Sequence, residues 1–187
     1  MPTSSLTFRR AARGDVPQVV ALVERAYRGE ASRAGWTTEA DLLAGQRTDE
    51  VEVAALLAAS DTRFVLASRS AELVGSMMLA RHDGSLAAKG TVYVGMLAVL
   101  PTLQASGIGR ALLGEAERLT RDERLGDTLR MTVIGQRSEL IAWYERRGYR
   151  RTGEREPFPY GKPRFGLPRR EDLYFEVLEK AVDQRER

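Results

Sequence analysis

Hydrophobic residues recur along this chain at two spacings, which predict a succession of strands and helices. Alternating or continuous apolar runs are typical of strands, and we expect strands at residues 6–11, 64–68, 73–81, 91–100, 129–134, 149–154 and 173–180. Apolar residues three and four positions apart are typical of helices, and we expect helices at residues 15–27, 39–46, 49–59 and 138–148, with a further helix that begins at residue 107. Asp15 and Thr38 stand where the first two of these helices need N-caps.

The order of these elements indicates the fold class. The strands at 64–68 and 73–81 are separated by four residues, RSAE, and so form an antiparallel hairpin. The remaining elements predict an α/β (α+β) domain, with a mixed central sheet flanked by helices that cover both faces of a central strand pair. A chain of 187 residues is long enough for one domain with a sizeable core and hardly for two. We therefore expect a single domain over residues 1–187.

The composition is that of a soluble globular protein, with 43% hydrophobic and 29% charged residues. No run approaches the roughly 18 apolar residues that cross a bilayer, and the opening MPTSSLTFRR has no apolar segment that could serve as a secretory signal. We therefore expect a cytoplasmic protein without membrane contact.

Two rare residue types restrict the chemistry. The chain has no cysteine, which excludes disulfides, thiolate metal sites and a cysteine nucleophile. Its only histidine, His82, lies in ARHDGS, which we interpret as an exposed turn rather than a catalytic position. We expect no metal, and a reaction that uses carboxylates, tyrosine, hydroxyls and backbone groups.

The small net charge of +3 hides a local excess of basic residues. Residues 146–170 contain nine basic and two acidic side chains. Such a patch could bind nucleic acid, an acidic cofactor or an acidic substrate. It could equally be a solvated basic surface in an arginine-rich chain. Nothing in the sequence resembles a dedicated recognition helix, which disfavours nucleic acid.

A glycine-containing turn, QASGIGRALL at residues 104–113, follows the strongest strand and opens a helix. Helix N-termini expose unpaired amides that attract phosphate, and glycine lets a ligand approach the backbone. A P-loop is excluded, because Gly109 is followed by Arg110 and Ala111 instead of lysine and a hydroxyl residue. The dinucleotide fingerprint is excluded, because Leu112 replaces its third glycine.

The remaining pattern, Gln-x-x-Gly-x-Gly, resembles the acetyl-coenzyme A loop of the GNAT acetyltransferase superfamily. A second segment, LIAWYERRGYRRTGE at residues 140–154, is similar to another motif of that family. The resemblance extends over roughly residues 6–180 and is specific at 94–113 and 138–154. It implies acetyl-CoA as co-substrate, bound where a central strand at 94–100 splays from its neighbour.

The resemblance also implies residue roles. Main-chain groups of Leu97 and Val99 would pair with the pantetheine arm, and Tyr144 would protonate the departing thiolate. The alternative for Tyr144 is a core aromatic beside Trp143. The implied cofactor-binding residues are Leu97, Ala98, Val99, Gln104, Ala105, Ser106, Gly107, Ile108, Gly109, Arg110 and Tyr144. Ser138 departs from the family, many members of which have a cofactor-binding asparagine there.

The acceptor amine should be bound by the segment after the first helix and by the loop before the last strand. The implied substrate-binding residues are Trp36, Glu39, Tyr93, Tyr160 and Arg164. Arg164 or Lys162 would suit a carboxylate on an amino-acid-like acceptor. The alternative is a surface loop stabilised by its own aromatic residues.

Deprotonation of the acceptor has no obvious base, because TVYVGMLAVLP contains no carboxylate. Either a water chain ending at backbone carbonyls or one of four carboxylates would serve: Glu24, Glu30, Glu52 or Glu139. The main prediction is therefore an acetyl-CoA-dependent N-acetyltransferase that acts on a small-molecule amine or a peptide by direct attack in a ternary complex. A non-catalytic acyl-CoA-binding module on the same fold is the alternative. Family members are often homodimers, although no stretch here marks an interface.

Overall fold

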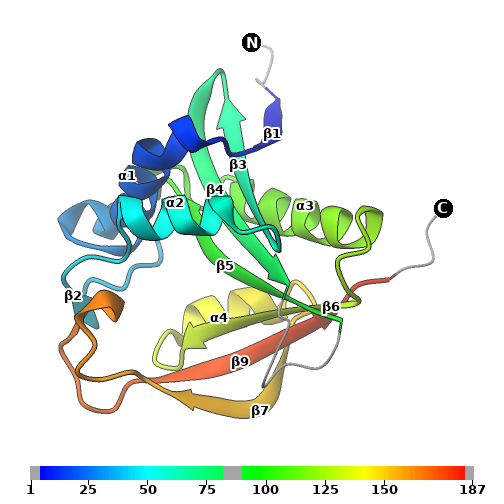
Figure 1. Cartoon of the computed structure of the whole chain (residues 1–187). Helices are drawn as coiled ribbons and strands as arrows, with labels where there is room; N and C mark the ends of the chain where they lie inside the picture. The colour runs from blue at the N-terminus through cyan, green and yellow to red at the C-terminus, as the bar shows by residue number, and fades with distance from the viewer. Residues whose placement is uncertain (1–4, 82–89, 184–187) are drawn as a thin grey trace.

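The computed structural model describes residues 5–81 and 90–183 (Figure 1). Its α-helices are α1 (Val16–Tyr27), α2 (Glu50–Ala58), α3 (Ile108–Asp122) and α4 (Ser138–Glu145). Its strands are β1 (Leu6–Arg10), β2 (Leu43–Ala44), β3 (Thr62–Arg69), β4 (Glu72–Arg81), β5 (Thr91–Val99), β6 (Thr128–Ile134), β7 (Arg150–Pro157), β8 (Leu167–Pro168) and β9 (Tyr174–Ala181). None of the helices in the described ranges is long and apolar enough to cross a membrane.

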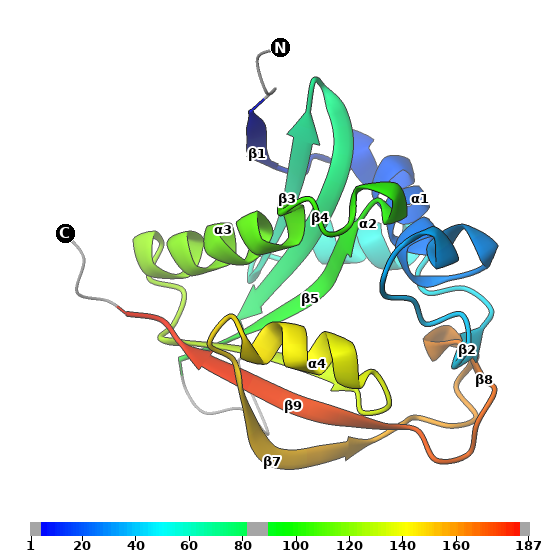
Figure 2. The same cartoon turned by 180° about the vertical axis from the view of Figure 1, so that it is seen from behind.

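Seven strands form one mixed sheet in the order β1-β3-β4-β5-β6-β9-β7, and β2 pairs separately with β8. All neighbours in the large sheet are antiparallel except β5 and β6, which are parallel. Helices α1 and α2 cover one face of the sheet, while α3 and α4 cover the other (Figures 1 and 2). The predicted mixed sheet with flanking helices is confirmed.

The sheet is split along its centre. Strand β5 pairs with β6 only from Thr91 to Tyr93, although both strands continue well beyond that point. A bulge between β4 and β5 accompanies the separation, and Met96 at this bulge has a left-handed backbone with φ +46°. The predicted splaying of the central strand is therefore observed.

Apolar faces of the helices and strands meet in one main core around this sheet. Helix α1 buries Val19, Leu22 and Val23 on one face, and α3 buries Leu112 and Ala116 on another. Both helices follow the three-and-four spacing of their apolar residues. This packing holds the N-terminus of α3 and the start of α4 beside the gap between β5 and β6.

The helix expected at residues 39–46 is absent, and this prediction was wrong. These residues form a turn followed by strand β2, which pairs with β8 more than 120 positions later. The Thr38 hydroxyl accepts from the Ala40 amide at 3.0 Å, which favours a turn over a helix start. Asp15 precedes α1 as expected, but its carboxylate accepts from Arg9 and from the Ala12 amide instead of capping the helix. His82 lies outside the described residues.

Candidate active site

A groove of about 600 Å³ lies between the N-terminus of α3 and the helix α4. Strand β5 contributes Leu97 and Val99, and α4 contributes Trp143 and Tyr144. Four arginines also line the groove: Arg110, Arg137, Arg146 and Arg147. None of its described lining residues is acidic. A concave site with this charge suits a polyanion.

The backbone that enters α3 is shaped to bring amides to the surface of this groove. Gly107 is the N-cap of α3 with φ +89°, and Ala105 has φ +64°. A Cβ added at Gly107 would meet nothing within 4 Å, so the backbone there is open. Because the first amides of a helix have no partner inside it, this turn can bind phosphate oxygens.

Arg147 and Trp143 form one wall of the groove. The Arg147 Cζ lies 3.6 Å from the centroid of the Trp143 ring, and its Nη1 donates to the Trp143 carbonyl at 2.7 Å. Burial, together with repulsion from Arg146 and Arg110, lowers the pKa of Arg147 below its usual value. An anion in the groove would relieve this repulsion.

A second cavity, of about 530 Å³, lies between β5 and β6. Its wall is mixed, with apolar side chains such as Leu56, Met78 and Phe175 beside charged ones. The charged lining residues are Arg28, Glu39, Arg47, Glu52, Arg130, Arg137, Glu156 and Arg164. The cavity is therefore lined by five arginines and three glutamates.

The two hollows meet where the sheet is split. They share five lining residues: Tyr27, Leu97, Arg137, Leu140 and Tyr144. The Tyr27 hydroxyl donates to the Leu97 carbonyl at 2.8 Å and so fixes the bulged strand at this junction.

Tyr144 is the hydroxyl group best placed at the junction. Its side chain is buried, and its hydroxyl makes no hydrogen bond to another described residue. Burial raises the pKa of Tyr144 far above its usual value, so that the phenol stays protonated. A neutral, unbonded hydroxyl between two cavities is available to donate a proton.

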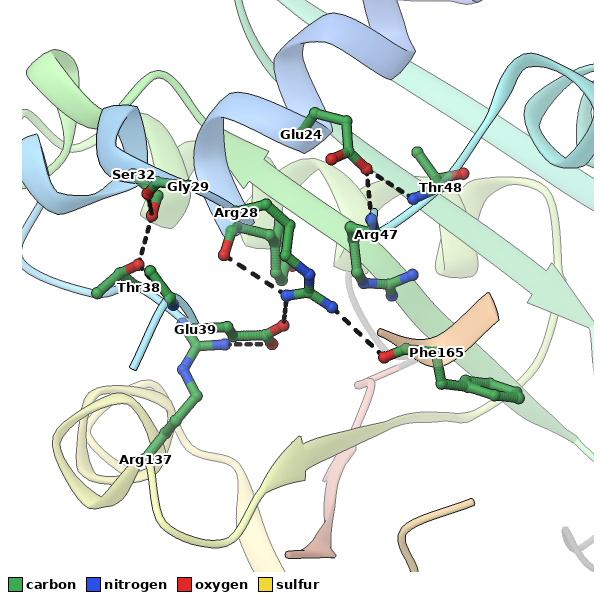
Figure 3. Close-up of polar contacts among 12 residues, drawn as sticks. Glu24, Arg28, Gly29, Ser32, Thr38, Glu39, Arg47, Thr48, Arg137 and Phe165 are labelled. Carbon is green, nitrogen blue, oxygen red and sulfur yellow. Dashed lines mark hydrogen bonds and ion pairs between the residues drawn. The ribbon is translucent and has the colours of Figure 1, made fainter. Parts of the chain in front are cut away.

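Glu39 is the centre of an ion cluster beside the junction (Figure 3). Arg28 donates to one of its oxygens, and Arg137 donates to the other at 2.8 Å. Although burial acts to raise it, the arginines hold the pKa of Glu39 below its usual value. The carboxylate is therefore ionised, with both oxygens occupied, and it ties the end of α1 to the start of α4.

The structure brings together most of the residues implied for the co-substrate. Leu97, Val99, Gln104, Ala105, Gly107, Gly109, Arg110 and Tyr144 line the first groove. Three others do not line it. Ala98 and Ile108 are core residues, and the Ser106 hydroxyl donates to the Leu103 carbonyl at 2.6 Å. The Oε1 atom of Gln104 accepts from the Thr37 amide at 3.3 Å, which supports the neighbouring loop.

The residues implied for the acceptor are less concentrated. Glu39, Tyr93 and Arg164 line the second cavity. Trp36 lines the first groove instead, 6.2 Å from Trp143 between ring centroids. Tyr160 lines neither, and its hydroxyl accepts from the Leu173 amide at 2.7 Å.

Of the four carboxylates considered as bases, Glu52 alone lines the second cavity. Glu24 accepts from two backbone amides, Glu30 pairs with Arg33, and Glu139 is exposed on α4. The basic patch at residues 146–170 is divided: Arg146 and Arg147 line the first groove, and Arg164 lines the second cavity. The other six basic residues of the patch line neither hollow.

Sequence reasoning missed four residues around the junction: Tyr27, Arg28, Arg47 and Arg137. Tyr27 reads as the last apolar residue of an amphipathic helix, and the arginines read as surface residues. Within the described ranges, no group of three or more potential metal-ligating side chains is found.

The sequence model of the acetyltransferase (GNAT) family matches residues 21–149. The chain therefore belongs to this family of acetyltransferases, which generally use acetyl-CoA. A search of curated proteins finds no match.

Solved structures show the same fold. The ribosomal-protein-S18-alanine N-acetyltransferase of Escherichia coli is 16% identical with a TM-score of 0.68, covering 96% of this chain and 95% of that one. The ribosomal-protein-alanine N-acetyltransferase of Brucella melitensis is 18% identical with a TM-score of 0.70, covering 94% and 99%. A chimeric spermidine N-acetyltransferase from Vibrio cholerae is 14% identical with a TM-score of 0.66, covering 96% of both chains. At these identities the likeness establishes the fold alone.

Proposed function

We propose that this protein transfers the acetyl group of acetyl-CoA to a primary amine of a small molecule or peptide. The observation that carries this proposal is the meeting of a basic groove and a second cavity at Tyr144. Two ligands bound in these hollows would have their reactive ends side by side. This arrangement suits direct transfer in a ternary complex.

The first groove fits coenzyme A in charge and shape. The α3 amides from Gly107 to Arg110 would bind the pyrophosphate, and the arginines of the groove would neutralise the phosphates. Main-chain groups of Leu97 and Val99 would hold the pantetheine arm in the gap between β5 and β6. When bound, acetyl-CoA would supply a thioester at the junction as the acetyl donor.

Tyr144 would act as the general acid. The acceptor nitrogen forms a bond to the acetyl carbon while the carbon–sulfur bond breaks, and the leaving sulfur takes the hydroxyl proton of Tyr144. The proton lost by the acceptor restores the phenol through solvent or Glu52. The chain has no cysteine that could form an acetyl-enzyme intermediate, which supports direct attack.

The first experiment combines binding with turnover. Acetyl-CoA should raise the melting temperature of the protein, because a ligand that binds only the folded state stabilises it. A panel of amino acids, polyamines, aminoglycosides and peptide N-termini should then reveal acceptors by release of free CoA thiol. No thermal shift with saturating acetyl-CoA would refute the proposal.

A non-catalytic acyl-CoA-binding module is the second candidate, and the lack of a carboxylate on β5 favours it. The second cavity argues for the enzyme, because a module that only binds the cofactor does not need a 530 Å³ cavity beside the thioester site. Thermal stabilisation by acetyl-CoA without thiol release over the whole panel would favour the module.

A further inference from the structure

Arg47 stands in the second cavity on a backbone that is held firmly in place. Glu24 of α1 accepts hydrogen bonds from the amides of both Arg47 and Thr48 (Figure 3). Two residues further on, Asp49 caps α2 by accepting from the Glu52 amide at 2.8 Å. The segment that carries Arg47 is therefore bonded to one helix and continues directly into another.

The Arg47 guanidinium has no polar partner within the described residues. It makes neither a hydrogen bond nor an ion pair there, and its Cζ lies 5.4 Å from the centroid of the Tyr27 ring. The other four arginines of the cavity are all paired with glutamates. Arg28 and Arg137 bind Glu39, Arg130 binds Glu154 and Glu179, and Arg164 lies 3.8 Å from Glu52.

The surroundings keep Arg47 charged without neutralising it. Burial opposes the charge, but attraction to Glu39 and other neighbours outweighs it, so that the pKa of Arg47 is above its usual value. Glu39 is already bonded to two arginines. Of the five arginines that line the cavity, Arg47 is thus the one whose charge has no glutamate partner among the described residues.

We propose that the acceptor amine carries a carboxylate, and that Arg47 binds it. This inference rests on the acetyl transfer proposed above and names the class of acceptor. The planar guanidinium can bind a carboxylate through two parallel hydrogen bonds. Apolar lining residues such as Leu56, Met78 and Phe165 suit an apolar body. The acceptor is thus an amino acid or a similar amine with an apolar side chain.

Tyr27 contacts both Arg47 and the junction of the two hollows. The Arg47 guanidinium lies over the Tyr27 ring. The Tyr27 hydroxyl donates to the Leu97 carbonyl at the junction of the two hollows. The carboxylate site at Arg47 and the junction are therefore linked through one side chain, that of Tyr27. The proposed acceptor would extend from Arg47 past Tyr27 to the junction.

Arg164, suggested by the sequence for the same purpose, is less suited to it. Its side chain is 69% exposed and already lies near Glu52. Lys162 is exposed and does not line the cavity. Arg47 is only partly exposed, and a less solvated cation binds an anion more strongly because water competes less with the contact.

The test compares acceptors that differ only in the carboxylate. Leucine, leucinamide and isopentylamine would be assayed by thiol release, with the corresponding phenylalanine and methionine series beside them. The native protein should prefer an acid over its amide by about tenfold or more in kcat/KM, the scale of one charge-assisted contact. Equal rates for acid and amide in all series would overturn the inference.

Substitutions assign the preference to Arg47. Arg47→Met should reduce the ratio of kcat/KM for the acid to kcat/KM for the amide by about tenfold. Arg47→Lys should reduce this ratio less, because lysine keeps the charge without the planar fork. Arg25→Met is the control, since Arg25 is exposed on α1 and outside the cavity. An unchanged ratio in Arg47→Met, or in Arg47→Lys if the first variant does not fold, would also overturn the inference.

A binding measurement separates this inference from the proposed function. 4-Methylpentanoate, which has the carboxylate but no amine, should bind the native protein and bind Arg47→Met at least tenfold more weakly. If no amine is acetylated but Arg47→Met binds 4-methylpentanoate more weakly than the native protein, the proposed acetyl transfer is refuted and the carboxylate site is supported. If amines are acetylated and the difference is missing, the carboxylate site alone is wrong.

Discussion

Removal of one oxygen atom from Tyr144 tests the proposed mechanism most directly. The Tyr144→Phe substitution keeps the ring, which packs edge-on against Trp143 and Tyr149 with centroids 5.0 and 5.7 Å away. It deletes only the hydroxyl at the junction of the two hollows. The change therefore addresses proton transfer without disturbing the walls.

The structure predicts different magnitudes for stability and for rate. The hydroxyl has no bond to a described residue, so its loss should alter the free energy of unfolding by less than about 1 kcal/mol. A positioned general acid contributes about 100-fold or more to a rate. We therefore expect kcat to fall at least about 100-fold, while the Kd for acetyl-CoA stays within about twofold because the contacts of the groove remain.

Tyr149→Phe provides the matched control. Tyr149 is also buried, its hydroxyl also has no hydrogen-bond partner among the described residues, and burial raises its pKa as well. It lines neither hollow. Steady-state release of thiol measures kcat for both variants, and isothermal titration measures acetyl-CoA binding. Unchanged turnover in Tyr144→Phe, or an equal loss in Tyr149→Phe, would refute the assignment of Tyr144 as the acid.

Two further predictions concern acid stability and co-substrate binding. The hydrogen bonds from Arg9 lower the pKa of Asp15 from 3.8 to about 2, so the stability that Asp15 contributes is complete above pH 3.8 and is lost as the pH falls toward 2. Asp15→Asn should therefore cost about 1–2 kcal/mol at neutral pH and less at acid pH, measured by urea unfolding; a cost that does not change with pH would contradict this account. Arg147→Gln should raise the Kd for acetyl-CoA by about threefold to tenfold at low salt and by less at high salt. The exposed Arg151→Gln should leave it unchanged, because Arg151 lies outside the groove and bonds to Glu145; equal effects of the two would indicate a general charge effect.

The elements that the sequence predicted correctly are those whose local pattern and tertiary role agree. In α1 and α3 the apolar residues that follow the helical spacing in the sequence are also the side chains that the folded protein buries in its core. Gln104 to Arg110 carry a recognisable pattern because the phosphate binding proposed for this turn needs glycine and open amides within a few residues. The helix expected at residues 39–46 failed because β2 pairs with a distant β8, which no local pattern reveals.

The acceptor side was harder to predict, because its charges come from separate segments. Arg28 follows α1, Arg47 precedes α2 and Arg137 precedes α4, and only the folded chain brings them around one cavity. Each looks like a solvated surface arginine in the sequence. Tyr160 shows a different pattern: it was implied for substrate binding because it lies in an aromatic, proline-containing loop, and in the structure its hydroxyl accepts from the Leu173 amide.

The split in the sheet is closed at both ends. Pairing from Thr91 to Tyr93 joins β5 to β6 at one end, and Glu39 joins Arg28 to Arg137 at the other. The gap between β5 and β6 is thus bounded at both ends by fixed contacts. One of its sides opens toward α3 and α4, and the other opens toward α2. The two proposed substrates, acetyl-CoA and the acceptor amine, would enter this gap from opposite sides and would not obstruct each other. Under the proposed transfer, the two products would also leave through opposite sides of the gap.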